Sequence, residues 1–319
     1  MPGHLGARIA AQKRAHAHGG AHAHAHSASV APDNGSAAFD SSTVVPLPGL
    51  GAAMHVRERA AGVSAEVAAA PSKPAILLFS ACPGDSRDFA AIVTLLSLRG
   101  HRCIAADWPG FGRSPPRPGP VTPSTFLAAA RELLTQLALS GPVVLIGNSV
   151  GGFVAARLAA ESPDRVAALV LVSPGGFTPH SCLTRLFCRS IMGSPALAPS
   201  SALFARLYLS CRTPTVAAML ARADGEQGTP DAREIIRSVW RAFPEPDNDL
   251  RAGAAAGITC PTLLVVGALD PVISHRADGR EARRALPRAH FKVLSTGHAP
   301  FAEAPGEFMA ALAPFLDAL

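Results

Sequence analysis

Residues 142–152 read PVVLIGNSVGG and decide the fold. The run PVVLIG is continuously apolar, as expected of a strand that is buried on both faces of a sheet. The residues that follow, Val150–Glu161, have the pattern of a helix, so Ser149 lies on a tight turn from strand to helix. Gly147 and Gly151 stand two residues to either side of Ser149 and remove side chains that would collide in such a turn. The stretch therefore predicts a strand, a tight turn that exposes the serine hydroxyl, and a helix.

Short apolar runs alternate with helical patterns on both sides of this turn. Such alternation indicates βαβ units, in which parallel strands are joined by helices that cover the sheet. We therefore predict an α/β fold with a mostly parallel, eight-stranded sheet and helices on both faces. The predicted strands are 44–47, 53–57, 75–80, 102–107, 142–147, 166–173, 261–267 and 290–294, and the predicted helices of the core are 86–98, 123–139, 150–161, 276–286 and 306–319.

A helical insertion interrupts this alternation between residues 177 and 257. The segment has no strand-like run, and prolines separate its helical stretches at 183–192, 201–209, 216–223 and 232–242. At roughly 80 residues it is too long for a loop. We expect a cap over the carboxyl edge of the sheet, where open α/β folds bind their ligands. The predicted organisation is an unpacked tail at 1–42, an α/β core at 43–176 and 258–319, and the cap at 177–257.

The tail carries alternating Ala and His residues. Closely spaced imidazoles can bind transition-metal ions weakly. A solvated, low-complexity segment is the simpler interpretation, because such a composition cannot form a packed core. The histidines concerned are His16, His18, His22, His24 and His26.

The composition excludes several classes of protein. Of the 319 residues, 48% are apolar and 16% are charged, and no apolar run approaches the ~20 residues needed to cross a bilayer. The formal charge of +6 comes almost entirely from scattered arginines, whereas nucleic-acid binding needs a clustered basic stripe. The six cysteines form no C-x-x-C pair and are typical of reduced thiols. We therefore expect a cytoplasmic protein with neither nucleic acid nor a membrane as its partner.

Two polar residues downstream of Ser149 follow predicted strands. Asp270 comes just after 261–267, and His298 comes just after 290–294, so both belong to the edge of the sheet where Ser149 lies. A serine hydroxyl is a poor nucleophile at neutral pH and needs an adjacent base, which in turn needs an orienting acid. We expect Ser149, His298 and Asp270 to form a catalytic triad.

Each of these residues also has a simpler interpretation when it is taken alone. Asp270 could be a helix N-cap before Pro271, and His298 could be an ordinary loop residue. Ser149 could belong to a glycine-rich phosphate-binding turn, but the chain contains no G-x-x-x-x-G-K-[ST] motif. Three suitable residue types at three strand ends favour the triad over these separate explanations.

Four motifs together resemble the α/β-hydrolase superfamily with a helical cap. They are ACPGDSRDF, ADWPGFGRS, GNSVGG and GHAPFAEAP, and the resemblance runs from about residue 43 to the end of the chain. GNSVGG and the later PDRVAALVLVSPGG look most like the esterase and carbon–carbon-bond hydrolase branches. Haloalkane dehalogenases and epoxide hydrolases have aspartate where Ser149 stands, which argues against those reactions.

The resemblance also implies an oxyanion hole made of the backbone N–H groups of Cys82 and Val150. Family members usually carry His-Gly directly after the first parallel strand, but Ser80-Ala81 stands in that place here. A loop shifted by this change would misplace the Cys82 amide and slow the reaction. Alternatively, the Cys82 thiol could be redox-sensitive, although the sequence around it shows no cationic signature.

These residues predict hydrolysis of a carboxylic ester or related carbonyl compound through an acyl-enzyme on Ser149, without a metal or organic cofactor. Cleavage of a carbon–carbon bond in a diketone-like substrate is an alternative, which the GNSVGG turn and the cap suggest. A ligand-binding protein that has kept the hydrolase shell is another, which the missing His-Gly pair suggests. Because the cap is rich in apolar residues, we expect a small, largely apolar substrate.

Overall fold

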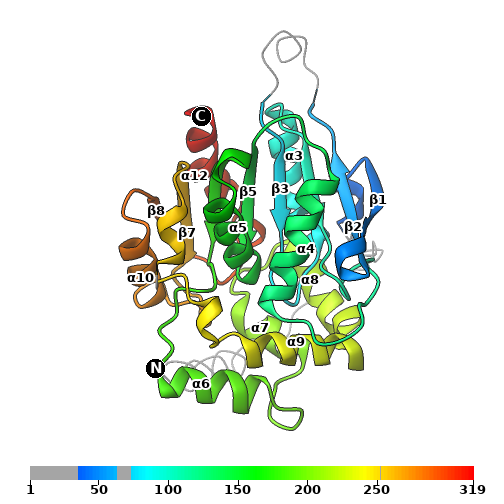
Figure 1. The fold of residues 1–319 in the computed structure, drawn as a ribbon, viewed down its shortest axis with the longest axis vertical. Coiled ribbons are helices and arrows are strands. Elements are labelled where there is room, and N and C mark those ends of the chain that lie inside the picture. The colour runs from blue at the N-terminus through cyan, green and yellow to red at the C-terminus, as the bar shows by residue number, and fades with distance from the viewer. Residues whose placement is uncertain (1–34, 63–72, 252) are drawn as a thin grey trace, which may run out of the picture.

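One eight-stranded sheet organises the computed structural model, which describes residues 35–62, 73–251 and 253–319. The strand order is β1-β2-β4-β3-β5-β6-β7-β8 (Figure 1). The β1–β2 and β2–β4 pairs are antiparallel and all the others are parallel, which confirms the predicted α/β fold. The strands are β1 Ser41–Leu47, β2 Ala52–Arg59, β3 Ile76–Phe79, β4 Cys103–Ala106, β5 Val143–Asn148, β6 Val166–Val172, β7 Thr262–Gly267 and β8 His290–Leu294.

Helices cover both faces of the sheet, and the central strands supply side chains to both layers (Figure 1). In β3, Leu77 and Phe79 pack in the layer of α4 and α5, whereas Leu78 packs in the layer of α3 and α12. This alternation explains why the central strands are apolar throughout. The helices of the core are α3 Ala90–Leu98, α4 Pro123–Gln136, α5 Val150–Glu161, α10 Asp278–Ala285, α11 Pro300–Glu303 and α12 Pro305–Asp317, with the short helices η1 Ser36–Ala38, η2 Pro48–Leu50, η3 Ser86–Phe89 and η4 Pro163–Arg165.

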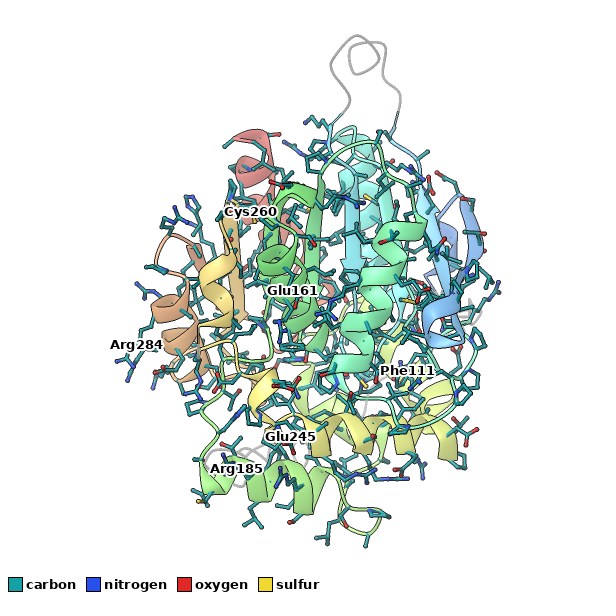
Figure 2. All side chains as sticks on the ribbon, viewed as in Figure 1. Phe111, Glu161, Arg185, Glu245, Cys260 and Arg284 are labelled. Carbon is teal, nitrogen blue, oxygen red and sulfur yellow. The ribbon has the colours of Figure 1, made fainter. Side chains whose placement is uncertain are left out.

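Between β6 and β7, residues 177–257 form what we call the inserted helical segment, and its described residues contain helices and no strand. Figure 2 shows Arg185 and Glu245 of this segment at one end of the molecule and Cys260 at the other. Because Cys260 precedes the first residue of β7, the segment lies at the carboxyl end of the parallel strands. Its elements are α6 Cys182–Leu186, η5 Phe187–Met192, α7 Ser201–Tyr208, α8 Pro214–Asp224, η6 Glu226–Gly228, α9 Pro230–Ala242, η7 Pro246–Asn248 and η8 Ala254–Gly257.

The start of the folded part lies earlier than predicted. The N–H of Asp40 donates to the carbonyl of Glu58 at 2.9 Å, and β1 begins at Ser41, inside the stretch predicted to be unpacked. Ser41 and Ser42 are exposed on an edge strand, where polar side chains give no apolar signal. The boundary at residue 42 was therefore wrong by a few residues, and the five tail histidines lie outside the described residues.

Two predicted helices are divided in the structure. The stretch 86–98 begins as the short 3-10 helix η3, whose start is closed by a capping box of Asp85 and Asp88, and continues as α3. The stretch 183–192 consists of α6 followed by η5, which has π-helical hydrogen bonding. Across the described ranges, no helix combines the length and the apolar character needed to cross a bilayer.

Candidate active site

Ser149 occupies the turn between β5 and α5 with φ 57° and ψ −118°, a backbone conformation that L-residues rarely adopt. The turn is so tight that only glycine fits two residues before and two residues after the serine. A Cβ atom on Gly147 would lie 2.2 Å from the carbonyl oxygen of Gly151, and one on Gly151 would lie 2.3 Å from that of Phe79. The second contact shows that the start of α5 packs directly on the end of β3, the strand that leads to Cys82.

His298 and Asp270 are joined by a hydrogen bond at the same edge of the sheet. Nδ1 of His298 lies 2.7 Å from Oδ2 of Asp270, and both residues are buried. The other carboxylate oxygen, Oδ1, accepts hydrogen bonds from the N–H groups of Val272 (2.8 Å) and Ile273 (3.0 Å). Because Oδ1 is bound by these N–H groups and Oδ2 faces Nδ1, the other ring nitrogen, Nε2, is available for a different partner.

Asn148 connects Ser149 to the loop of His298. Its Nδ2 donates to the carbonyl oxygens of Val172 and His298, at 3.0 Å each. The structure thus brings Asp270 and His298 into direct contact and ties the residue before Ser149 to the backbone of His298. In the described part of the chain, the Ser149 hydroxyl makes no hydrogen bond to the imidazole; such bonds often tighten only when substrate is bound.

The amides of Cys82 and Val150 lie on the two segments that Gly151 brings together. Val150 is the first residue of α5, so its N–H has no acceptor within the helix. Within the described residues, neither this N–H nor that of Cys82 donates to a protein acceptor. Ser80, which replaces the expected histidine, is buried, and its carbonyl accepts a 2.9 Å hydrogen bond from Nε1 of Trp108. The loop is therefore anchored although the His-Gly pair is missing.

The thiol of Cys82 does not have the surroundings of a redox-sensitive cysteine. Burial raises the pKa of this thiol well above its ordinary value. Because the thiolate is the reactive form, raising the pKa lowers the reactivity of this thiol at neutral pH. The backbone N–H of Cys82, which does not depend on the charge of the side chain, remains its chemically useful group.

Glu303 is a buried residue of the site that the sequence analysis did not single out. Its Oε2 accepts hydrogen bonds from the N–H groups of Ser210 (2.7 Å), Cys211 (3.0 Å) and Gly297 (2.8 Å), and its Oε1 accepts one from Ala299 (3.0 Å). The carboxylate therefore holds both neighbours of His298 and the chain that leaves α7. An acidic residue inside the otherwise uncharged run PFAEAP, which begins two residues after His298, was the available signal.

Asp107 organises a second loop in the same way. Burial opposes its ionisation, but hydrogen bonds from His55 Nδ1 (2.9 Å) and from the N–H groups of Arg113 (2.9 Å) and Ser86 (2.8 Å) hold the pKa of Asp107 below its usual value. This carboxylate fixes the loop after β4 to the start of η3. No group of three or more His, Cys, Asp or Glu side chains in the described ranges is arranged to bind a metal ion.

A row of aromatic side chains from the inserted helical segment ends on His298. The Tyr208 ring lies edge-on to the imidazole with centroids 5.3 Å apart, and Phe204 lies 5.1 Å from Tyr208. Trp240 lies 5.9 Å from Phe204, and Phe187 lies 5.9 Å from Trp240. The backbone N–H of His298 also donates to the carbonyl of Tyr208 at 2.9 Å. The segment thus places apolar surface beside the imidazole.

Comparisons with known proteins agree with this architecture. Residues 74–305, well over half of the chain, match the family described as alpha/beta hydrolase fold. Lipase 1 of Psychrobacter immobilis is 26% identical over 235 residues, which cover 73% of this chain and 73% of that protein. A putative lipase from Acinetobacter baumannii has a TM-score of 0.70 at 18% identity, covering 94% of this chain and 98% of that one. The enol-lactonase from Burkholderia xenovorans has a TM-score of 0.67 at 22% identity, covering 86% and 100%. The chain belongs to the alpha/beta hydrolase fold family.

Proposed function

We propose that this protein is a serine hydrolase that cleaves a carboxylic ester through a covalent acyl-enzyme on Ser149. The observation that carries the proposal is the buried hydrogen bond between His298 and Asp270, at the sheet edge that also holds the strained turn of Ser149. A carboxylate bound to Nδ1 keeps the proton on that nitrogen and leaves Nε2 as the base. The turn presents the hydroxyl clear of the sheet.

In the first half of the reaction, Nε2 of His298 takes the hydroxyl proton of Ser149 as its Oγ attacks the ester carbonyl carbon. The carbonyl π electrons move to oxygen, and the N–H groups of Cys82 and Val150 bind the resulting oxyanion. Asp270 stabilises the imidazolium. When the tetrahedral intermediate collapses, the bond to the alkoxy group breaks, and the imidazolium gives its proton to the departing alcohol.

In the second half, a water molecule takes the place of the alcohol. His298 removes a proton from this water as it attacks the acyl carbon, and the same two amides receive the second oxyanion. Collapse breaks the bond to Ser149 Oγ, which recovers its proton from the imidazolium. The acid product leaves and the enzyme returns to its starting state.

The substrate is proposed to carry a largely apolar group that rests on the inserted helical segment, which would act as the cap. The half-buried rings of Phe204 and Trp240 support this, because they continue the row that ends at His298. Ligand sites of this kind are lined mainly by apolar and aromatic side chains, with few polar groups. The names of the similar lipases point to the same class of bond.

The test is hydrolysis of p-nitrophenyl esters of increasing acyl length by the wild-type protein and by Ser149→Ala. We expect a drop in kcat on the order of 10⁴–10⁶ for Ser149→Ala. Ser190→Ala, which changes an exposed serine of η5, should keep wild-type activity. Full ester hydrolysis by Ser149→Ala would refute the proposal. If esters are inert and a vinylogous diketo acid is consumed in a Ser149-dependent way, the reaction is carbon–carbon cleavage instead.

A further inference from the structure

The loop that carries Cys82 leads directly into two buried carboxylates, those of Asp85 and Asp88. Asp85 Oδ1 accepts from the N–H of Arg87 at 2.9 Å, and Asp88 Oδ2 accepts from the N–H of Asp85 at 3.2 Å. A Cβ atom on Gly84 would lie 2.7 Å from Oδ2 of Asp88. The backbone between Cys82 and η3 therefore rests on the Asp88 carboxylate, and its position depends on where that carboxylate is held.

Two adjacent buried carboxylates need compensating cations. Arg87 supplies one from η3, because its Nε and Nη2 contact the two oxygens of Asp85 at 2.9 and 2.8 Å. The second cation comes from the inserted helical segment, 134 residues further along the chain than Asp88. Arg222 of α8 is 4% exposed, and its Nη2 lies 2.6 Å from Oδ1 of Asp88 and its Nε 3.3 Å from Oδ2 of Asp85.

A second contact binds the same two parts of the molecule at the rim of this cluster. Arg87 Nη1 and Nη2 lie 3.1 and 2.5 Å from the carboxylate oxygens of Glu226 in η6. Glu226 is about half exposed, so solvent screens its ion pair with Arg87. The ion pair of Arg222 with Asp88 is buried, so solvent screens it much less. The inner pair, Arg222 with Asp88, is therefore the link between the inserted helical segment and the loop that solvent and salt screen least.

The charge state of Asp88 depends on this link. Burial raises the pKa of Asp88 to about 6, and Arg222 opposes that rise. Without the guanidinium, the carboxylate would take up a proton or draw in water, and either change would move the oxygen on which Gly84 rests. The N–H of Cys82 would shift with it.

We propose, on the basis of the proposed function, that Arg222 is a positioning residue for the reaction. By pairing with Asp88 and Asp85, it holds the loop that presents the Cys82 N–H to the oxyanion. The inserted helical segment then does more than contact the substrate, because its docking on the core completes the oxyanion site. This buried cluster gives the loop an anchor in a chain that has Ser80-Ala81 in place of His-Gly.

The first test compares three variants with a soluble p-nitrophenyl ester. Arg222→Gln should lower kcat by about 10²–10³, the usual effect of losing one oxyanion donor, with KM changed by no more than about threefold. Arg222→Lys, which keeps a charge near Asp88, should recover most of the rate. Arg206→Gln, the control, breaks an exposed ion pair with Asp224 in the same segment and should keep the wild-type kcat.

The affinity for a trifluoromethyl ketone inhibitor distinguishes a positioning role of Arg222 from a purely structural one. Ser149 Oγ adds to its carbonyl carbon, the hydroxyl proton passes to Nε2 of His298, the π electrons move to oxygen, and the oxyanion needs both amides. Its inhibition constant should therefore rise for Arg222→Gln by about the same factor by which kcat falls, while inhibition by the corresponding alcohol, which has no carbonyl oxygen for the amides to bind, stays unchanged. Unchanged kcat and ketone affinity would overturn the proposal.

A double variant separates positioning from stability. Asp88→Asn combined with Arg222→Gln removes both charges, so no unpaired ion is left buried, and the urea midpoint should return toward wild type. Its kcat should remain low, because the loop has lost its anchor, and a wild-type kcat would overturn the proposal. If Ser149→Ala is inactive and the Arg222 variants are fully active, only the role of Arg222 is refuted; if Ser149→Ala is active, the proposed function fails first.

Discussion

Two loops frame Ser149, and different chemistry holds each of them. Beside His298, backbone N–H groups converge on one carboxylate, Glu303, and two of the donors belong to the loop itself. Beside Cys82, the loop rests on Asp88, whose cation, Arg222, comes from the inserted helical segment. The other two donors to Glu303, the N–H groups of Ser210 and Cys211, belong to the inserted helical segment, as does Arg222. Both sides therefore depend on the docked segment: the His298 side through backbone N–H groups, and the Cys82 side through one buried, charged side chain.

Asp270→Asn should lower kcat more than any other change discussed below that keeps Ser149 and His298. In the wild type, Oδ1 accepts from two backbone N–H groups, so the asparagine would keep its oxygen there and turn its NH₂ group toward Nδ1 of His298. The imidazole would then carry its proton on Nε2 and could not act as a base. We expect kcat to fall by about 10⁴ with little change in the urea midpoint.

The control for this change is Asp247→Asn, which alters an exposed aspartate at η7 and should leave kcat unchanged. A loss of less than tenfold for Asp270→Asn would show that the tautomer of His298 is not set by Asp270.

Glu303→Ala should have the largest effect on stability among single changes at the site. It would leave four backbone N–H groups without their acceptor in a buried region. We expect this to lower the free energy of unfolding by about 3–5 kcal/mol in total. Urea unfolding measures this change. Glu307→Ala, an exposed acid on α12, should stay within about 0.5 kcal/mol of wild type. Equal effects of the two substitutions would contradict the role given to Glu303.

Gly84→Ala alters the loop that carries Cys82 without changing any charged residue. The added Cβ would meet Oδ2 of Asp88 at 2.7 Å and the carbonyl of Ala81 at 2.9 Å, so the loop must shift. We expect kcat to fall about 10²-fold, because the Cys82 amide moves with the loop. Gly306→Ala has open space around it and should retain full activity. A fully active Gly84→Ala enzyme would show that catalysis does not depend on the position of the loop that carries Cys82.

The smallest expected effect is a pH dependence of stability. Burial raises the pKa of Asp88 to about 6, above its unfolded value of about 3.9. Between these values the folded state binds more protons, so the stability contributed by Asp88 is greatest below about pH 4 and declines as the pH rises to about 6. Relative to Asp88→Asn, the wild type should lose on the order of 1 kcal/mol per pH unit across this window. Urea midpoints of both proteins from pH 4 to 7 measure the difference, and a constant difference would contradict it.

The sequence was sufficient where local pattern and strand order decide the structure. The helix at Val150–Glu161 and the strand at His290–Leu294 lie where they were predicted, because each is defined by its own apolar pattern. The hydrogen bond of Asp270 with His298 was also anticipated, since both residues follow parallel strands that end at one edge.

Contacts between distant segments could not be predicted in this way. Arg222 and Asp88 are 134 residues apart, and their contact depends on how the inserted helical segment docks. Only an indirect signal existed: Arg222 lies three residues after Met219 and so shares a helix face with a buried residue. The hydrogen bonds from backbone N–H groups to Glu303 were even harder to predict from the sequence, because every residue except proline offers an N–H group.

The most direct test of the central claim is labelling with a fluorophosphonate, followed by mass spectrometry of the peptides. Attack by Ser149 Oγ on phosphorus would pass the hydroxyl proton to Nε2 of His298, displace fluoride and leave one phosphonyl group on the peptide that contains GNSVGG. We predict one adduct per chain on Ser149, lost in Ser149→Ala and formed far more slowly in His298→Ala. Ester hydrolysis by a protein that shows no adduct on Ser149, or an adduct on another residue, would contradict the account.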